Sequence, residues 1–542
     1  MRDSQPGMIL SFKVSEIQNG EDTTEPLHLG KFGFAFVLVL VVCSLVFRLL
    51  WLGRVPGING DEGWYGTQVT RMLSGKPWSP LTPSNLPINP QLFYTEALLL
   101  LVLEPSGFAL RLPIAIWAMI GVVLTFFLHR WVFGDKTESL LTAIFTACLP
   151  AHLAYSRFCW DACFSFVSVP LVLYSVLRIV EGRATIWAWT CFVLASILTV
   201  WTHATHALFV QACVFAIGWT WLKPWWQWAM ASKVRRQRTA ILFVLFLLGC
   251  LVWQWHAFIW YFAWGDRWLV ERFTAGWGAI NTVIDLTTGL RVYEYIAGMP
   301  RPTWVAGLYA LAIPAAVAAL IALFRCGRKP DRTLVLLTIF LVLMLLAPAV
   351  SIRLRYGSLS YERYLFYFLP LTAASFIRAS RVLAMRMGPQ GRAVPVVLSL
   401  AFSLGFLVQF WHYYLHPLSH HTYWKEMSET PQQTFGTGPI EPKTAAAEAI
   451  LQTRPPMNSR IYAVDWSIQG PIEYLMNSRF EVNLGPIQFD TDVPIFIVGY
   501  SHDSFIATAR VEIQRRGWSV VERDFCASTG GPIITLLMPF AP

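Results

Sequence analysis

The stretch that decides the fold is residues 31–66, KFGFAFVLVLVVCSLVFRLLWLGRVPGINGDEGWYG. Its first part is an apolar run of about 20 residues, the length that an α-helix needs to cross a bilayer. The run starts too far from residue 1, and is too long, for a cleaved signal peptide, so we expect it to remain as an anchor. Directly after it come two adjacent carboxylates among glycines and aromatic residues.

The whole chain of 542 residues has the composition of a membrane protein. It is 55% hydrophobic and 14% charged, whereas about a quarter of the residues in a soluble globular domain are charged. Its net charge of +10 would suggest nucleic acid as the partner of a soluble chain. Here, however, most Lys and Arg lie between apolar runs, where they set topology. We therefore expect membrane lipid as a partner and no nucleic acid.

Further apolar runs follow along the chain. With the first, they predict a polytopic α-helical membrane protein with about 11 transmembrane helices, near 32–52, 111–130, 138–156, 162–179, 185–201, 203–222, 239–262, 303–324, 333–350, 363–379 and 394–414. The division of 185–222 into two helices depends only on the residues Trp201, Thr202 and His203.

The positive charges predict the orientation of these spans. Short connections on the N-terminal side carry more Lys and Arg than those on the other side, and such connections stay in the cytoplasm. We expect a cytoplasmic tail (1–31), a transmembrane domain (32–415) with a long outer loop (53–110), and an extracytoplasmic segment (416–542). The absence of a recognisable sorting signal favours the plasma (inner) membrane.

The C-terminal segment predicts an α/β domain that is long enough to bury its own core. Helical patterns alternate with apolar runs typical of strands: helices at 442–454, 468–477 and 504–517, and runs at 460–466, 480–484, 494–500, 518–523 and 533–538.

The adjacent acids Asp61 and Glu62 are the first candidate site. Carboxylates at the edge of a span are costly unless they face a cavity. Because adjacent acids repel, one of them could have a raised pKa or pair with a cation, which suits a general base. The alternative is structural, with Asp61 as the N-cap of an amphipathic helix over 62–73.

Other polar residues on the predicted outer side also allow two interpretations. Arg157 and Asp161 could form an ion pair on one helix, or could join Asp61 in a polar site. Arg111, at the start of the second span, is more typical of an interfacial anchor. His203, with His206, could contact a sugar or form a hydrogen-bonded core pair.

Taken in order, these motifs resemble the C-type glycosyltransferases (GT-C), nearest to the protein O-mannosyltransferase and aminoarabinose transferase group. The resemblance covers roughly residues 32–380 and rests on Asp61-Glu62, the stretch Asn89–Tyr94, Arg111-Leu112-Pro113, Ser156-Arg157 with Asp161, and Arg363-Tyr364-Leu365. It implies transfer of a sugar from a polyprenyl-phosphate-linked donor to a protein, lipid or glycan acceptor on the outer face of the membrane, with inversion.

Inverting transfer needs a base for the acceptor proton and cationic cover for the departing phosphate. We assign the base to Asp61. An arginine suits phosphate oxygens because it is always charged and bidentate, so Arg363 is the first candidate for the cover and Arg157 the second.

The remaining candidates complete the predicted site. Asp161 would orient the acceptor or hold Arg157, and Glu62 would adjust the pKa of Asp61 or bind the sugar. The side chains expected to contact sugar or phosphate are Tyr94, Tyr364 and His203. Related aminoarabinose transferases carry Glu-Lys-Pro-Pro-Leu where this chain has Ile88–Leu92. The Glu and Lys of their metal and phosphate site are therefore absent, and we expect no required metal or other cofactor.

Two other functions fit a polytopic chain. A transporter or flippase for lipid-linked sugars would place ionisable residues near the bilayer midplane, often with inverted repeats, whereas here they gather at one predicted surface. An inert scaffold would have no need for that cluster. The motifs favour the transferase.

Overall fold

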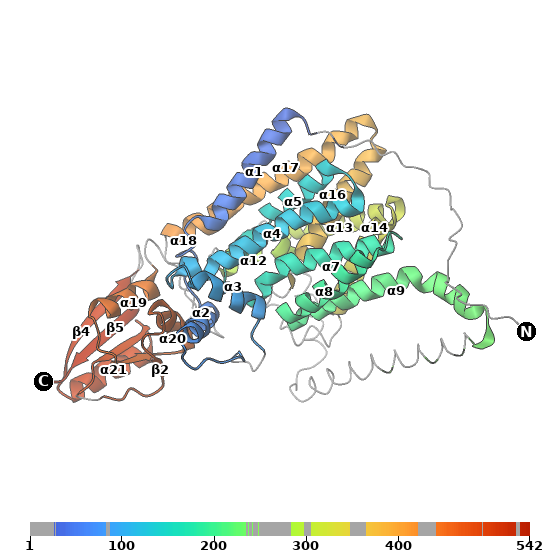
Figure 1. The fold of residues 1–542 in the computed structure, drawn as a ribbon. Helices are drawn as coiled ribbons and strands as arrows, with labels where there is room; N and C mark the ends of the chain where they lie inside the picture. The colour runs from blue at the N-terminus through green and yellow to red at the C-terminus, as the bar shows by residue number, and fades with distance from the viewer. Residues whose placement is uncertain are drawn as a thin grey trace, which may run out of the picture.

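The computed structural model describes residue 27 and residues 29–82, 87–234, 237, 241, 248, 283–296, 305–346, 365–420, 441–489, 492–526 and 532–542. Its described helices form a long bundle with a small sheet domain, α19 to β5, at one end (Figure 1). We call the end of the bundle beside this domain, where Asp61 and Asp161 lie, the sheet end. The opposite end, where Phe133 and Arg378 lie, is the far end.

Five of the described helices are long and apolar enough to cross a membrane, and the chain is a polytopic helical membrane protein. They are Lys31–Leu49 (α1), Gly107–Phe133 (α4), Asp161–Val180 (η1 with α7, Ser165–Val180), Phe368–Arg386 (α16) and Gly391–His420 (α17, Val394–Phe410, with its extensions). Shorter apolar helices are Ile186–Thr202 (α8) and parts of Ala207–Met230 (α9) and Val305–Cys326 (α13).

The remaining helices of the bundle follow the predicted runs, with one difference. The predicted helix 138–156 is broken at Pro150 into α5 (Lys136–Cys148) and α6 (Pro150–Tyr155), because proline lacks the N–H that a continuous helix needs. The predicted division of 185–222 is confirmed, since α8 ends at Thr202 and α9 begins at Ala207. Also described are α12 (Leu290–Tyr295) and α14 (Lys329–Leu346), and most of the predicted span 239–262 lies outside the described residues.

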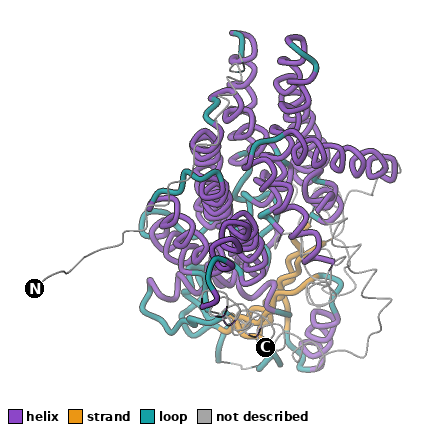
Figure 2. Tube along the Cα trace, turned by 90° about the vertical axis from the view of Figure 1, so that its right-hand side faces the viewer, coloured by secondary structure: helices purple, strands orange, loops and turns teal. Residues whose placement is uncertain are grey.

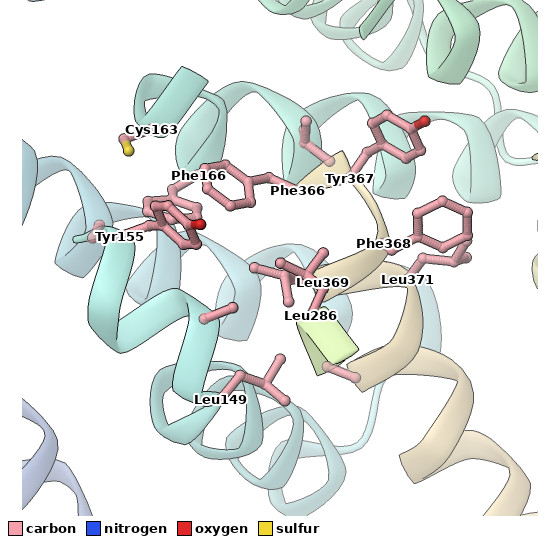
Figure 3. Packing of buried hydrophobic residues seen from close by; sticks show 14 of the residues in the cluster. Leu149, Tyr155, Cys163, Phe166, Leu286, Phe366, Tyr367, Phe368, Leu369 and Leu371 are labelled. Carbon is pink, nitrogen blue, oxygen red and sulfur yellow. The ribbon is translucent and has the colours of Figure 1, made fainter. Parts of the chain in front are cut away.

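Aromatic and aliphatic side chains fill the centre of the bundle (Figure 3). The Phe366 ring lies 4.8 Å from Tyr155 and 5.1 Å from Phe166, measured between centroids, so the start of α16 packs against α6 and α7. Leu286 and Leu369 lie in the same buried cluster. This core fixes the sheet end of the bundle, where α6 and α7 meet.

Two amphipathic helices, α2 (Gly60–Leu73) and α3 (Pro90–Leu100), lie at the sheet end. The N-cap of α2 is Asn59, whose side chain accepts a hydrogen bond from the Glu62 N–H in a capping box. The structural alternative for Asp61 as N-cap is therefore wrong, because the helix starts two residues earlier than predicted.

The sheet domain confirms the α/β prediction. It contains α19 (Pro442–Gln452), β1 (Arg460–Ala463), α20 (Trp466–Leu475), β2 (Val482–Leu484), β3 (Ile495–Tyr500), α21 (Ser504–Arg515), β4 (Ser519–Cys526) and β5 (Pro532–Phe540). The strand order is β2-β1-β3-β5-β4, with β1 parallel to β2 and β3, and β5 antiparallel to β3 and β4. Helices α19 and α20 cover one face and α21 the other, and Figure 2 shows the strands gathered in one region.

Candidate functional site

Glu62 is the most constrained side chain of the predicted site. It is fully buried, and its carboxylate makes a two-point ion pair with Arg111, at 2.8 Å to Nε and 2.6 Å to Nη2. The same carboxylate accepts hydrogen bonds from the Asn59 backbone and side chain and from the Cys159 N–H at 2.7 Å. Both oxygens of the Glu62 carboxylate are therefore held by neighbouring groups of the protein.

Arg111 has a different place from the interfacial position expected of it. Its guanidinium is fully buried and also donates to the carbonyls of Leu52, Pro56 and Gly57, at 3.2, 2.5 and 3.0 Å. Arginine can satisfy so many acceptors because it has five donors in a planar fork. Arg111 thus joins α4 to the turn that follows α1 and to α2.

Arg157 caps the C-terminal end of α1 by hydrogen bonds to backbone carbonyls. It is fully buried, and its two terminal nitrogens donate to the carbonyls of Phe47, Arg48, Leu50 and Val55, at 2.5 to 3.0 Å. Carbonyls at the end of a helix have no partner within that helix, so this arginine replaces the missing bonds. With both terminal nitrogens occupied by backbone, the described geometry does not support the predicted phosphate contact.

Arg157 and Asp161 do not share a helix, contrary to the ion-pair interpretation. Helix α6 ends at Tyr155, and Asp161 begins the short 3₁₀ turn η1 (Asp161–Phe164). The connection is instead pinned to the start of α2 by the Cys159 bond to Glu62 and by the Trp160 indole, which donates to Asn59 Oδ1 at 3.1 Å.

Asp61 and Asp161 lie on two elements that meet at the start of α2, where Trp160, the residue before Asp161, bonds the N-cap residue Asn59. Asp61 lies one turn before Tyr65 on α2, and Asp161 approaches from η1. Burial, followed by the charges of Asp161 and Asp61, raises the pKa of the Tyr65 hydroxyl well above its usual value. Each aspartate is half-buried, and the bond from Trp160 to Asn59 joins the two elements that carry them.

Asn89 completes this group of polar residues. Its Oδ1 caps α3 by accepting from the Gln91 N–H at 2.9 Å, and its amide donates to the Asp161 carbonyl at 3.4 Å. Among the described residues, no group of three or more His, Cys, Asp and Glu side chains could hold a metal, and we derive no step through one.

The other predicted contacts are placed as follows. Tyr94 is exposed on α3, with its ring edge-on to Phe93 at 5.5 Å. His203 lies at the break between α8 and α9, with Nδ1 2.7 Å from the Thr205 hydroxyl. Arg363 and Tyr364 lie outside the described residues.

Sequence reasoning missed Glu96, a second buried carboxyl at this end. It lies on α3 with Oε2 3.8 Å from the Cys159 thiol, and burial raises its pKa well above the usual range. The feature of the sequence that could have identified Glu96 is its position next to Ala97, on the apolar side of an amphipathic helix.

No protein-family model and no curated protein matches this chain. Among solved structures, ArnT from Cupriavidus metallidurans in the apo state is similar at 15% identity and a TM-score of 0.45, covering 94% of this chain and 100% of that chain. The same protein bound to undecaprenyl phosphate is similar at 14% identity and a TM-score of 0.45, and the match covers 94% of this chain and 99% of that chain. A third similar structure is the archaeal oligosaccharyltransferase AglB from Archaeoglobus fulgidus, in complex with an inhibitory peptide and a dolichol-phosphate. Its identity is 14% and its TM-score 0.44, and the match covers 87% of this chain and 69% of that chain.

ArnT and AglB are both GT-C glycosyltransferases, the superfamily that the motif order resembles. At these identities, and with TM-scores below 0.5, the likenesses establish neither family nor activity for this chain. The assignment of a function therefore depends on the site itself.

Proposed function

We propose that this protein is a glycosyltransferase that moves a sugar from a polyprenyl-phosphate-linked donor to an acceptor hydroxyl or amine on the outer face of the membrane. The observation that carries the proposal is the bond from the Trp160 indole to Asn59 Oδ1 at 3.1 Å, which joins the start of η1, with Asp161, to the start of α2, with Asp61, at the sheet end of a membrane bundle. Two half-buried carboxylates from separate elements offer a base and a second polar contact where a lipid-linked sugar and an acceptor can meet.

In this mechanism Asp61 takes the proton of the acceptor as its oxygen or nitrogen attacks the anomeric carbon. The bond from that carbon to the phosphate oxygen breaks, and its electrons leave with the lipid phosphate, so the configuration inverts. A phosphate is a weakly basic leaving group and needs cationic cover rather than a general acid. We assign that cover to Arg363, and the orientation of the acceptor to Asp161.

Glu62 and Arg111 support the base without touching the substrate. Glu62 holds the start of α2, and Arg111 anchors Glu62 to α4 and to the end of the first span. A catalytic group must be held close to its productive geometry by packed and hydrogen-bonded neighbours, and this buried pair supplies them for Asp61.

The test is sugar transfer by the purified protein in detergent, from radiolabelled polyprenyl-phosphate sugars to a pool of membrane acceptors. Asp61→Asn is expected to lower the rate about 100- to 10,000-fold, the usual contribution of a general base, because the amide cannot accept the proton. Glu448→Gln, which neutralises an exposed acid on α19, is the matched control and should keep the wild-type rate.

Two outcomes count against the proposal. Retained turnover by a folded Asp61→Asn protein would remove Asp61 from the role of base. Wild-type protein that binds the labelled lipids but consumes none of them would favour a transporter of lipid-linked sugars instead.

A further inference from the structure

Helix α2, which carries Asp61, presents a face of glycines to the sheet domain. Gly60, Gly63 and Gly66 recur every three residues, and helix α20 packs directly on them (Figure 1). A Cβ added to Gly63 would lie 2.2 Å from the Pro471 nitrogen, and one added to Gly66 would lie 2.5 Å from the Tyr474 ring. Only glycine allows so close an approach.

The contact next to Asp61 is the closest of the three. A Cβ on Gly60 would lie 2.1 Å from the Trp466 ring. From the other helix, a Cβ on Gly470 would lie 2.8 Å from the Trp64 nitrogen. The two backbones are therefore in contact on both sides of Asp61, and neither helix can shift without moving the other.

Polar contacts fix the register between the two helices. The bonds are Thr67 Oγ1 to the Gly470 carbonyl at 2.9 Å, Thr70 Oγ1 to Ser478 Oγ at 2.5 Å, and an ion pair between Arg71 Nε and Glu473 Oε1 at 2.6 Å. Beyond α2, the Tyr474 hydroxyl donates to the Ser106 carbonyl at 3.1 Å, and the buried Lys443 ammonium donates to the Ile58 carbonyl. Sliding α20, with the turn that follows it, along α2 would break the contacts of Thr67, Thr70 and Arg71.

We propose that the sheet domain is a positioning element of the active site, which stays docked during turnover and sets the place of Asp61 through α20. The inference rests on the proposed function in that Asp61 is the base. Helix α2 is held on one side by the Glu62–Arg111 pair and on the other by α20, and Asp61 lies in the same turn as both contacts. A shift of about 1 Å in a reacting group can cost about 100-fold in rate.

The first test compares alanine substitutions at glycines of the same type. Gly63→Ala and Gly66→Ala place a methyl group against α20, whereas Gly405→Ala in α17 meets nothing within 4 Å. The first two are expected to lower kcat about 100-fold with an unchanged KM for the lipid donor, and to increase amide hydrogen exchange over residues 60–70. Gly405→Ala should match the wild type in all three measurements.

Milder variants keep the test valid if the methyl groups prevent folding. Thr67→Val and Glu473→Gln remove polar contacts without adding bulk. They are expected to lower kcat by a smaller factor and to leave the KM for the lipid donor unchanged. Wild-type kcat in variants whose exchange over 60–70 has risen would overturn the proposal, and so would unchanged exchange in Gly63→Ala.

A disulfide between the two helices tests whether the domain stays docked. The hydroxyls of Thr70 and Ser478 are adjacent, so Thr70→Cys with Ser478→Cys should cross-link α2 to the turn that follows α20 on oxidation. The oxidised protein is expected to transfer sugar at the rate of its reduced form. Loss of transfer on oxidation, with recovery in dithiothreitol, would show that α20 must leave α2 and would overturn the proposal. If the wild type itself transfers no sugar, the proposed function fails, while the exchange measurements still decide whether α20 orders α2.

Discussion

Asp61 and Glu62 are neighbours in the sequence with opposite environments in the fold. The Glu62 side chain is fully buried and pairs with Arg111, whereas Asp61 is half-buried. A carboxylate with every acceptor occupied is a poor base, and a partly accessible one is available to a substrate proton. Burial thus separates the two roles that the residue types leave open.

Removal of one partner from the Glu62–Arg111 pair leaves an uncompensated buried charge, which costs about 3–5 kcal/mol of stability. We therefore expect Arg111→Leu and Glu62→Leu each to lower the unfolding midpoint in detergent strongly. Arg510→Leu breaks a partly exposed pair with Glu522 and should change stability by less than about 1 kcal/mol. Equal effects of the Arg111 and Arg510 variants would contradict the structural role of the buried pair.

The buried Glu96 side chain predicts that the stability of the fold decreases as the pH rises. Burial raises its folded pKa above the ordinary 4.5, so the folded state holds a proton that the unfolded state releases. The contribution of Glu96 to the free energy of unfolding is fully present below the pKa of the unfolded state. It falls by about 1.4 kcal/mol per pH unit as the pH rises toward the pKa of the folded state. Glu96→Gln cannot titrate, and its unfolding midpoint should fall less than that of the wild type between about pH 5 and pH 7. Parallel curves for the two proteins would show that Glu96 is ionised in the fold.

At the scale of the element, the far end of the bundle is joined by a buried cluster of charges. Arg378 on α16 makes a two-point ion pair with Asp331 on α14, at 2.6 and 2.9 Å, and contacts both oxygens of Glu138 on α5 at 3.0 Å. Arg381 adds bonds to Asp135 and Glu138 at 2.6 and 2.5 Å. One arginine thus connects three helices.

We expect Arg378→Met to destabilise the bundle by about 3–5 kcal/mol, because Asp331 would keep a buried negative charge without its arginine and Glu138 would keep only one arginine, Arg381. Thermal unfolding in detergent is the measurement, with Arg386→Met as the control at an exposed position of the same helix. Sugar transfer at low temperature should survive the Arg378 change, since the cluster lies at the opposite end from Asp61. A stability equal to that of the control would mean that the cluster is not needed to hold α5, α14 and α16 together.

The elements themselves could be predicted because their patterns are local. Apolar runs identify the helices of the bundle, and alternation of apolar runs with helical patterns identifies each strand of the sheet domain to within a few residues. The failures are also local: Asn59 was passed over as the cap of α2 because Asp61 is an equally good capping residue type. Proline at position 150 marks a break that the hydrophobic run of 138–156 conceals.

The contacts that build the site could not be predicted, because they join residues that are far apart in the sequence. Gly63 meets Pro471 and Thr70 meets Ser478 across some 400 positions, and no periodicity in either helix encodes its partner. The glycines every three residues on α2 were visible, yet they suggest only a close neighbour, not which one. The docking of the sheet domain on the helix that carries Asp61 is therefore the main addition of the structure.

The orientation of the whole molecule in the membrane follows from charge and can be tested directly. Connections rich in Lys and Arg adjoin the far end, where Arg178 bonds the Trp131 carbonyl and Arg328 lies over Phe133, whereas the sheet domain lies at the other end. By the positive-inside rule we predict that the far end is cytoplasmic and the sheet domain extracytoplasmic.

Two exposed positions distinguish the two orientations: Val511 on α21 of the sheet domain and Arg183 between α7 and α8 at the far end. In intact cells a membrane-impermeant maleimide should label Val511→Cys and leave Arg183→Cys unlabelled until the membrane is permeabilised. The wild type, with its native cysteines, sets the background of labelling. The reverse pattern would place Asp61 on the cytoplasmic side, and the acceptor of the proposed transfer would then be cytoplasmic as well.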